Sequence, residues 1–344
     1  MGLIILILVV ISVFFYFLKI PLFLSYIITG FLVSHFINFQ ESAIDFINYS
    51  AISILLFFIG FEFSFNKIHK YITYSLLNNF IALKIFVIFG ITFAYFLSKD
   101  LNSSIIFSLV IYPSSSIIVI KILQITNRLA NIETPIIIIG LIFEDIFIAI
   151  FLGILKGSYF SMINVLLVIL AIFINFKFKK IISKIVSFIT NLNREMFLII
   201  LFSSIFLANS ILNSPIGAFI LGILISDTSE SFFEKEISII RDIIFILFFF
   251  FFGYSLKNII SLIDVKHILI AILVFIISIL LKSLYFIQLK SIKLILRSTL
   301  VLIPRGEFSI FALYMIQNEE IKIIAGIFIT LSIISSLLIF CIKG

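Results

Sequence analysis

Long apolar runs separated by short polar clusters constrain this chain more than any other feature of its sequence. Of its 344 residues, 63% are hydrophobic and 12% are charged, and the mean hydropathy is +1.35. A soluble domain of this size carries about a quarter charged residues. Runs of about 20 apolar residues instead match the thickness of a bilayer when they form helices. The sequence therefore predicts an all-α polytopic membrane protein and argues against the soluble enzyme classes.

Cutting the sequence at the polar clusters predicts thirteen transmembrane helices. We expect the first of them, which has no charged leader and no small-residue cleavage site, to be retained as a helix. The predicted ranges are 2–18, 20–37, 43–63, 71–97, 102–122, 132–156, 160–179, 195–212, 214–227, 238–257, 266–288, 292–316 and 321–342.

The Lys and Arg residues between these helices predict the orientation of the chain. Alternating sides from the amino terminus, one side collects fourteen: Lys19, Lys67, Lys70, Lys121, Arg128, Lys177, Lys179, Lys180, Lys184, Arg194, Lys235, Lys290, Lys293 and Lys343. The other side collects five: Lys99, Lys156, Lys257, Lys266 and Lys322. Because positive residues are retained on the cytoplasmic side, we expect an external amino terminus and a cytoplasmic carboxy terminus.

Other classes of function find little support in the sequence. The net charge of +7 comes from short clusters between apolar runs, which favours membrane topology over nucleic-acid binding. Cys341 is the single cysteine, so no intrachain disulfide and no Cys/His metal cluster is expected. The sequence contains no GxGxxG or Walker motif, which argues against nucleotide hydrolysis.

Three segments recur in the same order at an offset of about 192 residues. The first pair is PLFLSYIITGFLVS, from Pro21, and SPIGAFILGILIS. The second pair is ILLFFIGFEFSFNKI and ILFFFFFGYSLKNI, and the third is LVIYPSSSIIVIKI and LVLIPRGEFSIFAL. In the second pair Gly60 corresponds to Gly253. In the third, Pro113 corresponds to Pro304. Six helices fill the first unit and one linker helix precedes the second, so the copies enter the bilayer from opposite sides. Such an inverted repeat is typical of secondary transporters.

Two adjacent carboxylates, Glu144 and Asp145, lie near the middle of the predicted helix 132–156. A charge there costs about 2.5–3.5 kcal/mol on insertion scales, so it requires a partner or a function. Burial and mutual repulsion both favour the protonated form, which predicts a proton-binding site. The alternative is a purely structural ion pair of these acids with Lys84 or Lys282, and Lys282 could also simply extend to the membrane surface.

Pro113 and Pro304 each interrupt an apolar run and predict two broken helices, although an ordinary kink is the alternative at each. Membranes tolerate such breaks where the freed backbone is buried in protein or lines a cavity. At the second break, Arg305 would complement the negative end of the first half-helix and Glu307 the positive end of the second.

The first break carries neutral residues in place of those charges, namely Ser114, Ser115 and Ser116. Hydroxyl and carbonyl oxygens suit a hard cation, and the helix dipoles at this break have no compensating charge within the break itself. We therefore expect a monovalent cation to bind between these serines and Asp145, with no other metal in the protein.

Four motifs in sequence order are LLFFIGFEFS in the third predicted helix, GLIFEDIFIAI in the sixth, RDIIFILFFFFFGYSL in the tenth and LIPRGEFSIFAL in the twelfth. Over nearly the whole chain they resemble the bacterial monovalent cation:proton antiporters, in the branch of Kef-type potassium efflux systems and NapA-like sodium/proton exchangers. By this resemblance, Asp145 is the essential ion- and proton-binding aspartate, Glu144 the variable preceding position, and Lys282 the basic residue that contacts the acidic pair. The Glu-Asp pair departs from the Asp-Asp of electrogenic exchangers and the Gln-Asp of Kef systems.

The resemblance also implies a NapA/NhaA-like antiporter fold without a cofactor. We expect dimerisation helices in 1–70 and 195–260, ion-translocating core helices in 71–156 and 266–342, and a linker in 157–194. We expect no C-terminal nucleotide-binding regulatory domain. The implied protein is a homodimer of the bacterial inner membrane.

Three functions follow from these observations. The first is exchange of sodium or potassium for protons by alternating access, with a carboxylate that binds cation or proton in competition. The second is a cation-coupled solute symporter, against which the scarcity of further polar residues in the apolar runs argues. The third is a gated cation efflux channel.

Overall fold

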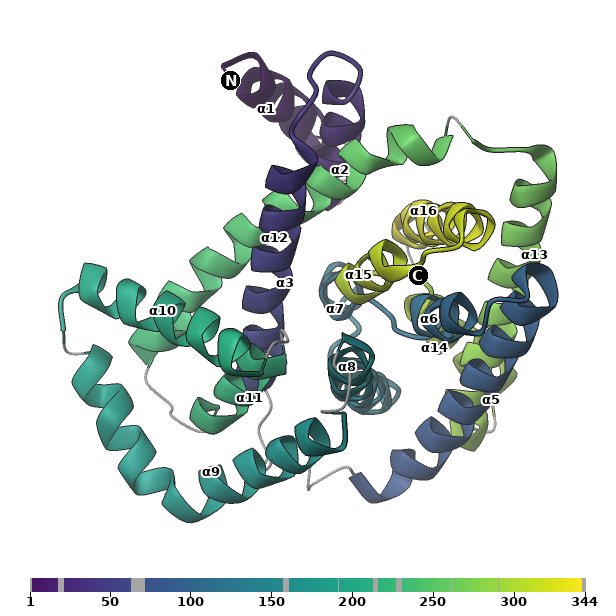
Figure 1. Cartoon of the computed structure of the whole chain (residues 1–344). Helices are drawn as coiled ribbons and strands as arrows, with labels where there is room; N and C mark the ends of the chain where they lie inside the picture. Colours follow the sequence, from purple (N-terminus) through teal and green to yellow (C-terminus); the bar gives the residue numbers. More distant parts are fainter. Residues whose placement is uncertain are drawn as a thin grey trace. The chain divides into compact units, whose positions relative to one another are not determined.

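The computed structural model describes residues 2–17, 22–62, 72–156, 161–190, 192–212, 216–226, 231–260, 262–289 and 291–341, and within these ranges its regular elements are helices (Figure 1). They are α1 (Gly2–Phe17), α2 (Leu22–Val33), α3 (Glu41–Glu62), α5 (Ile72–Ser98), α6 (Leu101–Ile111), α7 (Ser116–Ile125), α8 (Thr134–Lys156), α9 (Ser161–Thr190), α10 (Arg194–Leu212), α11 (Ile216–Ile225), α12 (Ser231–Ile260), α13 (Val265–Lys282), the 3₁₀ helix η1 (Ser283–Leu289), α14 (Ile292–Val301), α15 (Glu307–Met315) and α16 (Glu319–Cys341).

The prediction of an all-helical chain is confirmed for the described residues. Each of the thirteen predicted ranges overlaps an α-helix, and the ranges 102–122 and 292–316 each overlap two α-helices, separated at the prolines. Four helices in the described residues are long and apolar enough to cross a membrane, at Asn78–Ser98, Glu195–Leu212, Ile239–Lys257 and Val265–Ile287. The number of crossings stays a prediction.

Large apolar side chains are exposed along many of these helices. On α1, for example, Leu6 is 60% and Phe14 60% exposed, and on α13 Leu269 is 62% and Leu280 63% exposed. Soluble monomers rarely expose so much contiguous apolar surface, because water cannot solvate it favourably. Lipid acyl chains remove that cost, so the helix surfaces fit a membrane environment.

The chain divides into two compact units. One comprises Met1–Asn38, Lys67–Asp145 and Phe252–Gly344, and the other comprises Phe39–Asn66 and Ile146–Phe251. Helices α1, α2, α5, α6, α7 and α13 to α16 belong to the first unit, together with the carboxyl-terminal end of α12. Helices α3, α9, α10 and α11 belong to the second.

In the second unit, α3 and α11 cross at two glycines. A Cβ atom added to Gly60 would collide with the carbonyl oxygen of Phe219, and one added to Gly222 would collide with that of Phe57. The absence of side chains at these two positions lets the helix backbones touch. The side-chain amide of Asn175 of α9 caps the carboxyl-terminal end of α11 by donating to the carbonyl oxygens of Ile223 (2.5 Å) and Leu224 (3.1 Å).

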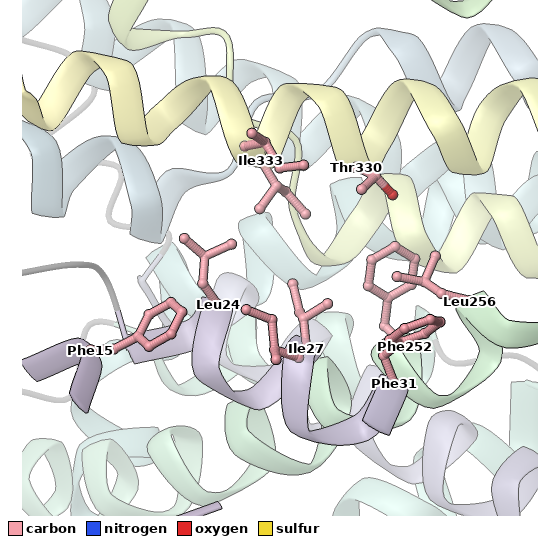
Figure 2. Close-up of a pocket in the computed structure, with 10 residues that line it drawn as sticks. Phe15, Leu24, Ile27, Phe31, Phe252, Leu256, Thr330 and Ile333 are labelled. Carbon is pink, nitrogen blue, oxygen red and sulfur yellow. The ribbon is translucent and has the colours of Figure 1, made fainter. Parts of the chain in front are cut away.

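In the first unit, α2 and the end of α12 make a similar contact. A Cβ atom at Gly253 would collide with the backbone of Ile27. Beside this contact lies an apolar pocket of about 280 Å³, where Leu24 and Ile27 of α2 face Ile333 and Thr330 of α16 (Figure 2). Phe15 of α1 also lines it.

The glycine contact between α3 and α11 predicts the outcome of a small substitution. Gly222→Ala should lower the melting temperature in detergent, because the new methyl group meets the backbone of α3 and overpacking of this kind costs about 1–3 kcal/mol.

Gly326→Ala in α16 is the matched control. There the added methyl group meets the end of the Ile259 side chain, which can move, and alanine favours the helix over glycine. Equal melting temperatures for the two variants would contradict the proposed packing role of Gly222.

Candidate ion-binding site

The first helix break separates α6 from α7. Helix α6 ends at Ile111, Tyr112 caps it, and Pro113 follows with no N–H to donate. Helix α7 begins at Ser116 after Ser115, whose extended backbone (φ −77°, ψ 108°) gives the N-cap conformation. The freed amides and hydroxyls of this break lie in the interior of the first unit, where Ser114 and Ser115 are buried.

The second break separates α14 from α15. Helix α14 ends at Val301, Pro304 lies in the break, and α15 begins at Glu307 with Gly306 as its N-cap. The placement of Glu307 in the first turn of α15, at its positive end, agrees with the sequence prediction.

The two breaks contact each other through their backbones. The N–H of Ser115 donates to the carbonyl oxygen of Pro304 at 2.8 Å, and the hydroxyl of Ser114 donates to that of Leu302, also at 2.8 Å. A Cβ atom at Gly306 would lie 2.5 Å from the Ser115 side chain, so this close approach requires glycine. Each break thus satisfies polar groups that the other leaves without a helical partner.

Arg305 lies buried at the end of α14, where the sequence predicted a compensating positive charge. Its Nη1 atom donates to the carbonyl oxygens of Leu302 (2.9 Å) and Ile303 (3.2 Å). The guanidinium also lies 5.5 Å from the centre of the Phe328 ring of α16. The charge therefore meets the negative end of a half-helix.

Glu144 and Asp145 of α8 meet the start of α7. The N–H of Ser114 donates to Glu144 Oε2, and the hydroxyl of Ser116 donates to Asp145 Oδ2, both at 2.6 Å. The break has no compensating charge of its own, and the two carboxylates complete it from outside. The acids come from another helix, α8, and lie at the positive end of α7, where a carboxylate is favoured.

Lys282, at the end of α13, forms an ion pair with Glu144 Oε1. Both side chains are fully buried. The ammonium also lies 5.4, 5.2 and 4.9 Å from the ring centres of Phe86, Tyr112 and Tyr285. A buried ammonium needs both a counterion and further contacts, and aromatic faces supply the latter.

The predicted site residues thus come together from four separate parts of the sequence. Glu307 joins the group through Ser115, whose hydroxyl lies 3.4 Å from Glu307 Oε2. Lys84, the alternative partner of the acids, lies on an exposed part of α5. Arg297 lies 3.5 Å from Glu133, outside this group.

Sequence reasoning missed the aromatic residues around Lys282 and the contact of Ser332 with the second break. The hydroxyl of Ser332 accepts a hydrogen bond of 3.1 Å from the N–H of Arg305. Tyr112 directly precedes Pro113, which is a signal that sequence reasoning could have used. Phe86, Tyr285 and Ser332 stand in ordinary apolar surroundings along the chain, and no local pattern marks them.

The two adjacent carboxylates therefore differ in what surrounds them. Glu144 is fully buried and neutralised by Lys282, while Asp145 retains 8% exposure and faces a hydroxyl of the α7 N-terminus. A hydroxyl can donate to a carboxylate and can also present its oxygen to a cation. Within the described ranges, no three His, Cys, Asp or Glu residues gather as a metal-binding group.

Comparison with known proteins identifies the class to which this fold and site belong. The family model described as sodium/hydrogen exchanger, transmembrane, matches residues 3–344. The chain belongs to this family and is a multi-pass membrane protein.

The proteins to which it is similar include two relatives and one solved structure. The potassium/proton antiporter subunit KhtU of Bacillus subtilis is 30% identical over 63% of this chain, and the match spans 57% of KhtU's own length. The ammonium/proton antiporter subunit AmhT of Alkalihalophilus pseudofirmus is 28% identical over 94% of this chain and 87% of AmhT. The sodium proton antiporter MjNhaP1 of Methanocaldococcus jannaschii matches with a TM-score of 0.70 at 18% identity, over 99% of this chain and 94% of MjNhaP1. That last likeness shows a shared fold.

The buried ion pair of Lys282 and Glu144 predicts that the effects of substituting these two residues on stability are strongly coupled. Lys282→Ala should destabilise the protein in detergent by about 3–5 kcal/mol, because it leaves Glu144 buried without its cation. In a Glu144→Gln background the same change should cost much less. Thermal unfolding of the four proteins in this double-mutant cycle measures the coupling.

Additive losses in the cycle would contradict the pairing. Lys293→Ala, at an exposed lysine of α14, controls for the loss of a positive charge and should leave melting nearly unchanged.

Proposed function

We propose that the chain is a monovalent cation:proton antiporter in which Asp145 binds either a proton or a cation. The observation that supports this most directly is the different surroundings of the two adjacent carboxylates. Glu144 is held by Lys282 and by the backbone of Ser114, whereas Asp145 faces the Ser116 hydroxyl. The Ser116 hydroxyl can donate to this carboxylate or turn its oxygen towards a cation, so Asp145 can change its occupant.

Competition for one carboxylate couples the two fluxes. When Asp145 carries a proton or a cation, the site is closer to neutral and can be exposed to the other side of the membrane; when it carries neither, the buried negative charge opposes the movement. The serines of the first break, Ser114 to Ser116, are the proposed additional oxygen ligands. Arg305, Glu307 and Lys282 compensate the fixed charges of the site.

The glycine contacts support the proposed inverted repeat. In the second unit, Gly60 meets the carbonyl of Phe219; in the first unit, the corresponding Gly253 meets Ile27. Ile27 and Phe219 lie 192 residues apart, which is the offset of the sequence repeat. In each case the third helix of one repeat thus meets the second helix of the other at matched positions, as a two-fold relationship requires.

The names of the relatives narrow the choice of cations to test. They are described as potassium/proton, ammonium/proton and sodium proton antiporters. We propose potassium or sodium as the cargo, and ammonium belongs in the same test because it carries the same charge. A role in pH homeostasis follows from any such exchange.

The remaining parts of the proposal concern assembly and placement. We propose a homodimer of the bacterial inner membrane with an external amino terminus, a cytoplasmic carboxy terminus and thirteen crossings. The excess of Lys and Arg on one side supports this orientation. Helices within 1–70 and 195–260 would form the dimer contact, those within 71–156 and 266–342 the moving core, and 157–194 the link.

Replacement of Asp145 tests the function. In proteoliposomes containing a pH-sensitive dye, Asp145→Asn should reduce cation-driven proton movement to the rate of protein-free vesicles, because it removes the charge that both substrates share. Potassium, sodium and ammonium gradients are applied in turn.

Asp100→Asn is the matched control. Asp100 caps α6 by accepting from the N–H of Asn102, and asparagine caps a helix equally well. A hydrogen bond from Ser103 lowers the pKa of Asp100, so this carboxylate is charged throughout the assay and does not take part in proton exchange. Proton-coupled flux of normal rate in folded Asp145→Asn protein would rule out the proposed function. Cation flux that follows voltage without proton countertransport would support the channel instead.

The fixed Glu144–Lys282 pair predicts electroneutral exchange of one proton for each monovalent cation. Transport by the wild-type protein should therefore be insensitive to an imposed membrane potential, and Glu144→Gln should retain exchange with a shifted pH optimum. A potential-dependent rate would show instead that more than one proton moves per cation.

A further inference from the structure

Helix α9 in the second unit has two parts, joined at a bend that is visible in Figure 1. At Phe178 the backbone leaves the helical conformation (φ −110°, ψ 20°). After the bend, Ile182, Val186 and Ile189 recur at helical spacing and pack into the core that α3, α10 and α11 share. The second part of α9 is therefore attached along one face to the body of the unit.

An apolar pocket of about 200 Å³ lies between this part of α9, α10 and α11. Its lining comprises Ile182, Ile185, Val186, Ile189, Phe197, Ile200, Leu201, Ser204, Leu221 and Ile225. Ile185 both lines the pocket and is 54% exposed. An exposed residue in the lining means that the pocket opens to the surface of the protein.

The same part of α9 carries a dense positive charge. Lys177, Lys179, Lys180 and Lys184 lie within eight residues, all of them exposed, and the sequence from 161 to 194 contains no Asp or Glu. Lys180 and Lys184 are four residues apart and share one side of the helix. The acidic residue on the neighbouring α10 is Glu195, in its first turn.

Between the lysine side and the packed side runs an apolar edge. Ile181 is 56% and Phe188 is 68% exposed, and with Ile185 they share one edge of the helix by their spacing. A helix with a basic side next to an exposed apolar edge is typical of the membrane interface, where lysines reach the headgroups and apolar residues reach the acyl chains.

We propose that this surface is a binding site for one anionic phospholipid. An acyl chain enters the pocket past Ile185, and the phosphate of the headgroup binds Lys180 and Lys184. The apolar lining selects a hydrocarbon chain, and the lysines, with no acid on their own helix, select a negative headgroup over a zwitterionic one. The two features adjoin on one helix segment, which is the arrangement a phospholipid requires.

The experiment measures retained lipid on the purified full-length chain. The protein is delipidated in detergent, incubated with equal amounts of phosphatidylglycerol and phosphatidylcholine of the same acyl chains, and analysed by native mass spectrometry. We expect phosphatidylglycerol to be retained preferentially. The double variant Lys180→Gln/Lys184→Gln should weaken its retention about 25-fold, five-fold for each lysine.

Two further variants distinguish a built site from general attraction of charges. Ser204→Leu fills part of the pocket and loses only a hydroxyl bonded to the Leu201 carbonyl, so it should also reduce retention. Lys121→Gln/Lys293→Gln removes two exposed lysines of other helices and should leave retention unchanged.

Equal retention of the two lipids, or an equal effect of the two lysine pairs, would overturn the proposal. Loss of retention in the Lys180/Lys184 variant with none in Ser204→Leu would also overturn it, because the pocket would then play no part. Since no readout involves transport, failure of this proposal and failure of the antiporter proposal are distinguishable.

Discussion

The backbone contact between the two helix breaks supports the rest of the site. Pro113 and Pro304 free peptide groups in the interior of the first unit, where an unsatisfied group costs several kcal/mol in a medium without water. The Ser115 N–H and the Ser114 hydroxyl donate to carbonyls of the second break, which lowers that cost and fixes the two breaks against each other. This contact holds the half-helix ends close together, so that their dipoles favour charged side chains in the same region.

The fixed charges follow from this geometry. Two half-helix ends and their dipoles cannot remain bare in an apolar interior, so Arg305 meets the carbonyls after α14 and Glu307 opens α15. The acids of α8 reach the amides before α7 in the same way. Buried Glu144 requires a counterion, which Lys282 supplies. The ammonium of Lys282 in turn contacts the rings of Phe86, Tyr112 and Tyr285, because a buried ammonium with one counterion still needs contacts on its other sides. The presence of the two helix breaks therefore accounts for most of the polar residues in this interior.

Sequence reasoning was most successful where a physical cost is visible in a single residue. A proline or a carboxylate within an apolar run is conspicuous, so the breaks, Glu144, Asp145, Arg305 and Glu307 could all be found without a structure. It expected a cation between the serines of the first break and Asp145, but it did not specify which atoms of separate helices meet. The first break has no charge of its own, and the acids that complete it come from α8, about thirty residues later. The aromatic residues around Lys282 were invisible for a different reason: in a chain that is 16% aromatic, a Phe or Tyr carries no signal.

The two breaks occupy matching places in the proposed repeat but differ in chemistry, and we propose that this difference gives the site its function. With Pro113 aligned to Pro304, Glu307 corresponds to Ser116, so the same position holds a neutral hydroxyl in one copy and a carboxylate in the other. If both copies carried their own charges, as the second does with Arg305 and Glu307, the helix dipoles at both breaks would be fully compensated. No unoccupied position would then remain for an exchangeable ion. If neither did, the unpaired dipoles would destabilise the interior. Because the first break is completed by acids from a separate helix, one of those acids can bind a passing cation or proton while the other holds the helix end in place. One self-sufficient and one dependent break would thus separate stability, carried by Arg305, Glu307 and the Glu144–Lys282 pair, from the proposed exchange at Asp145.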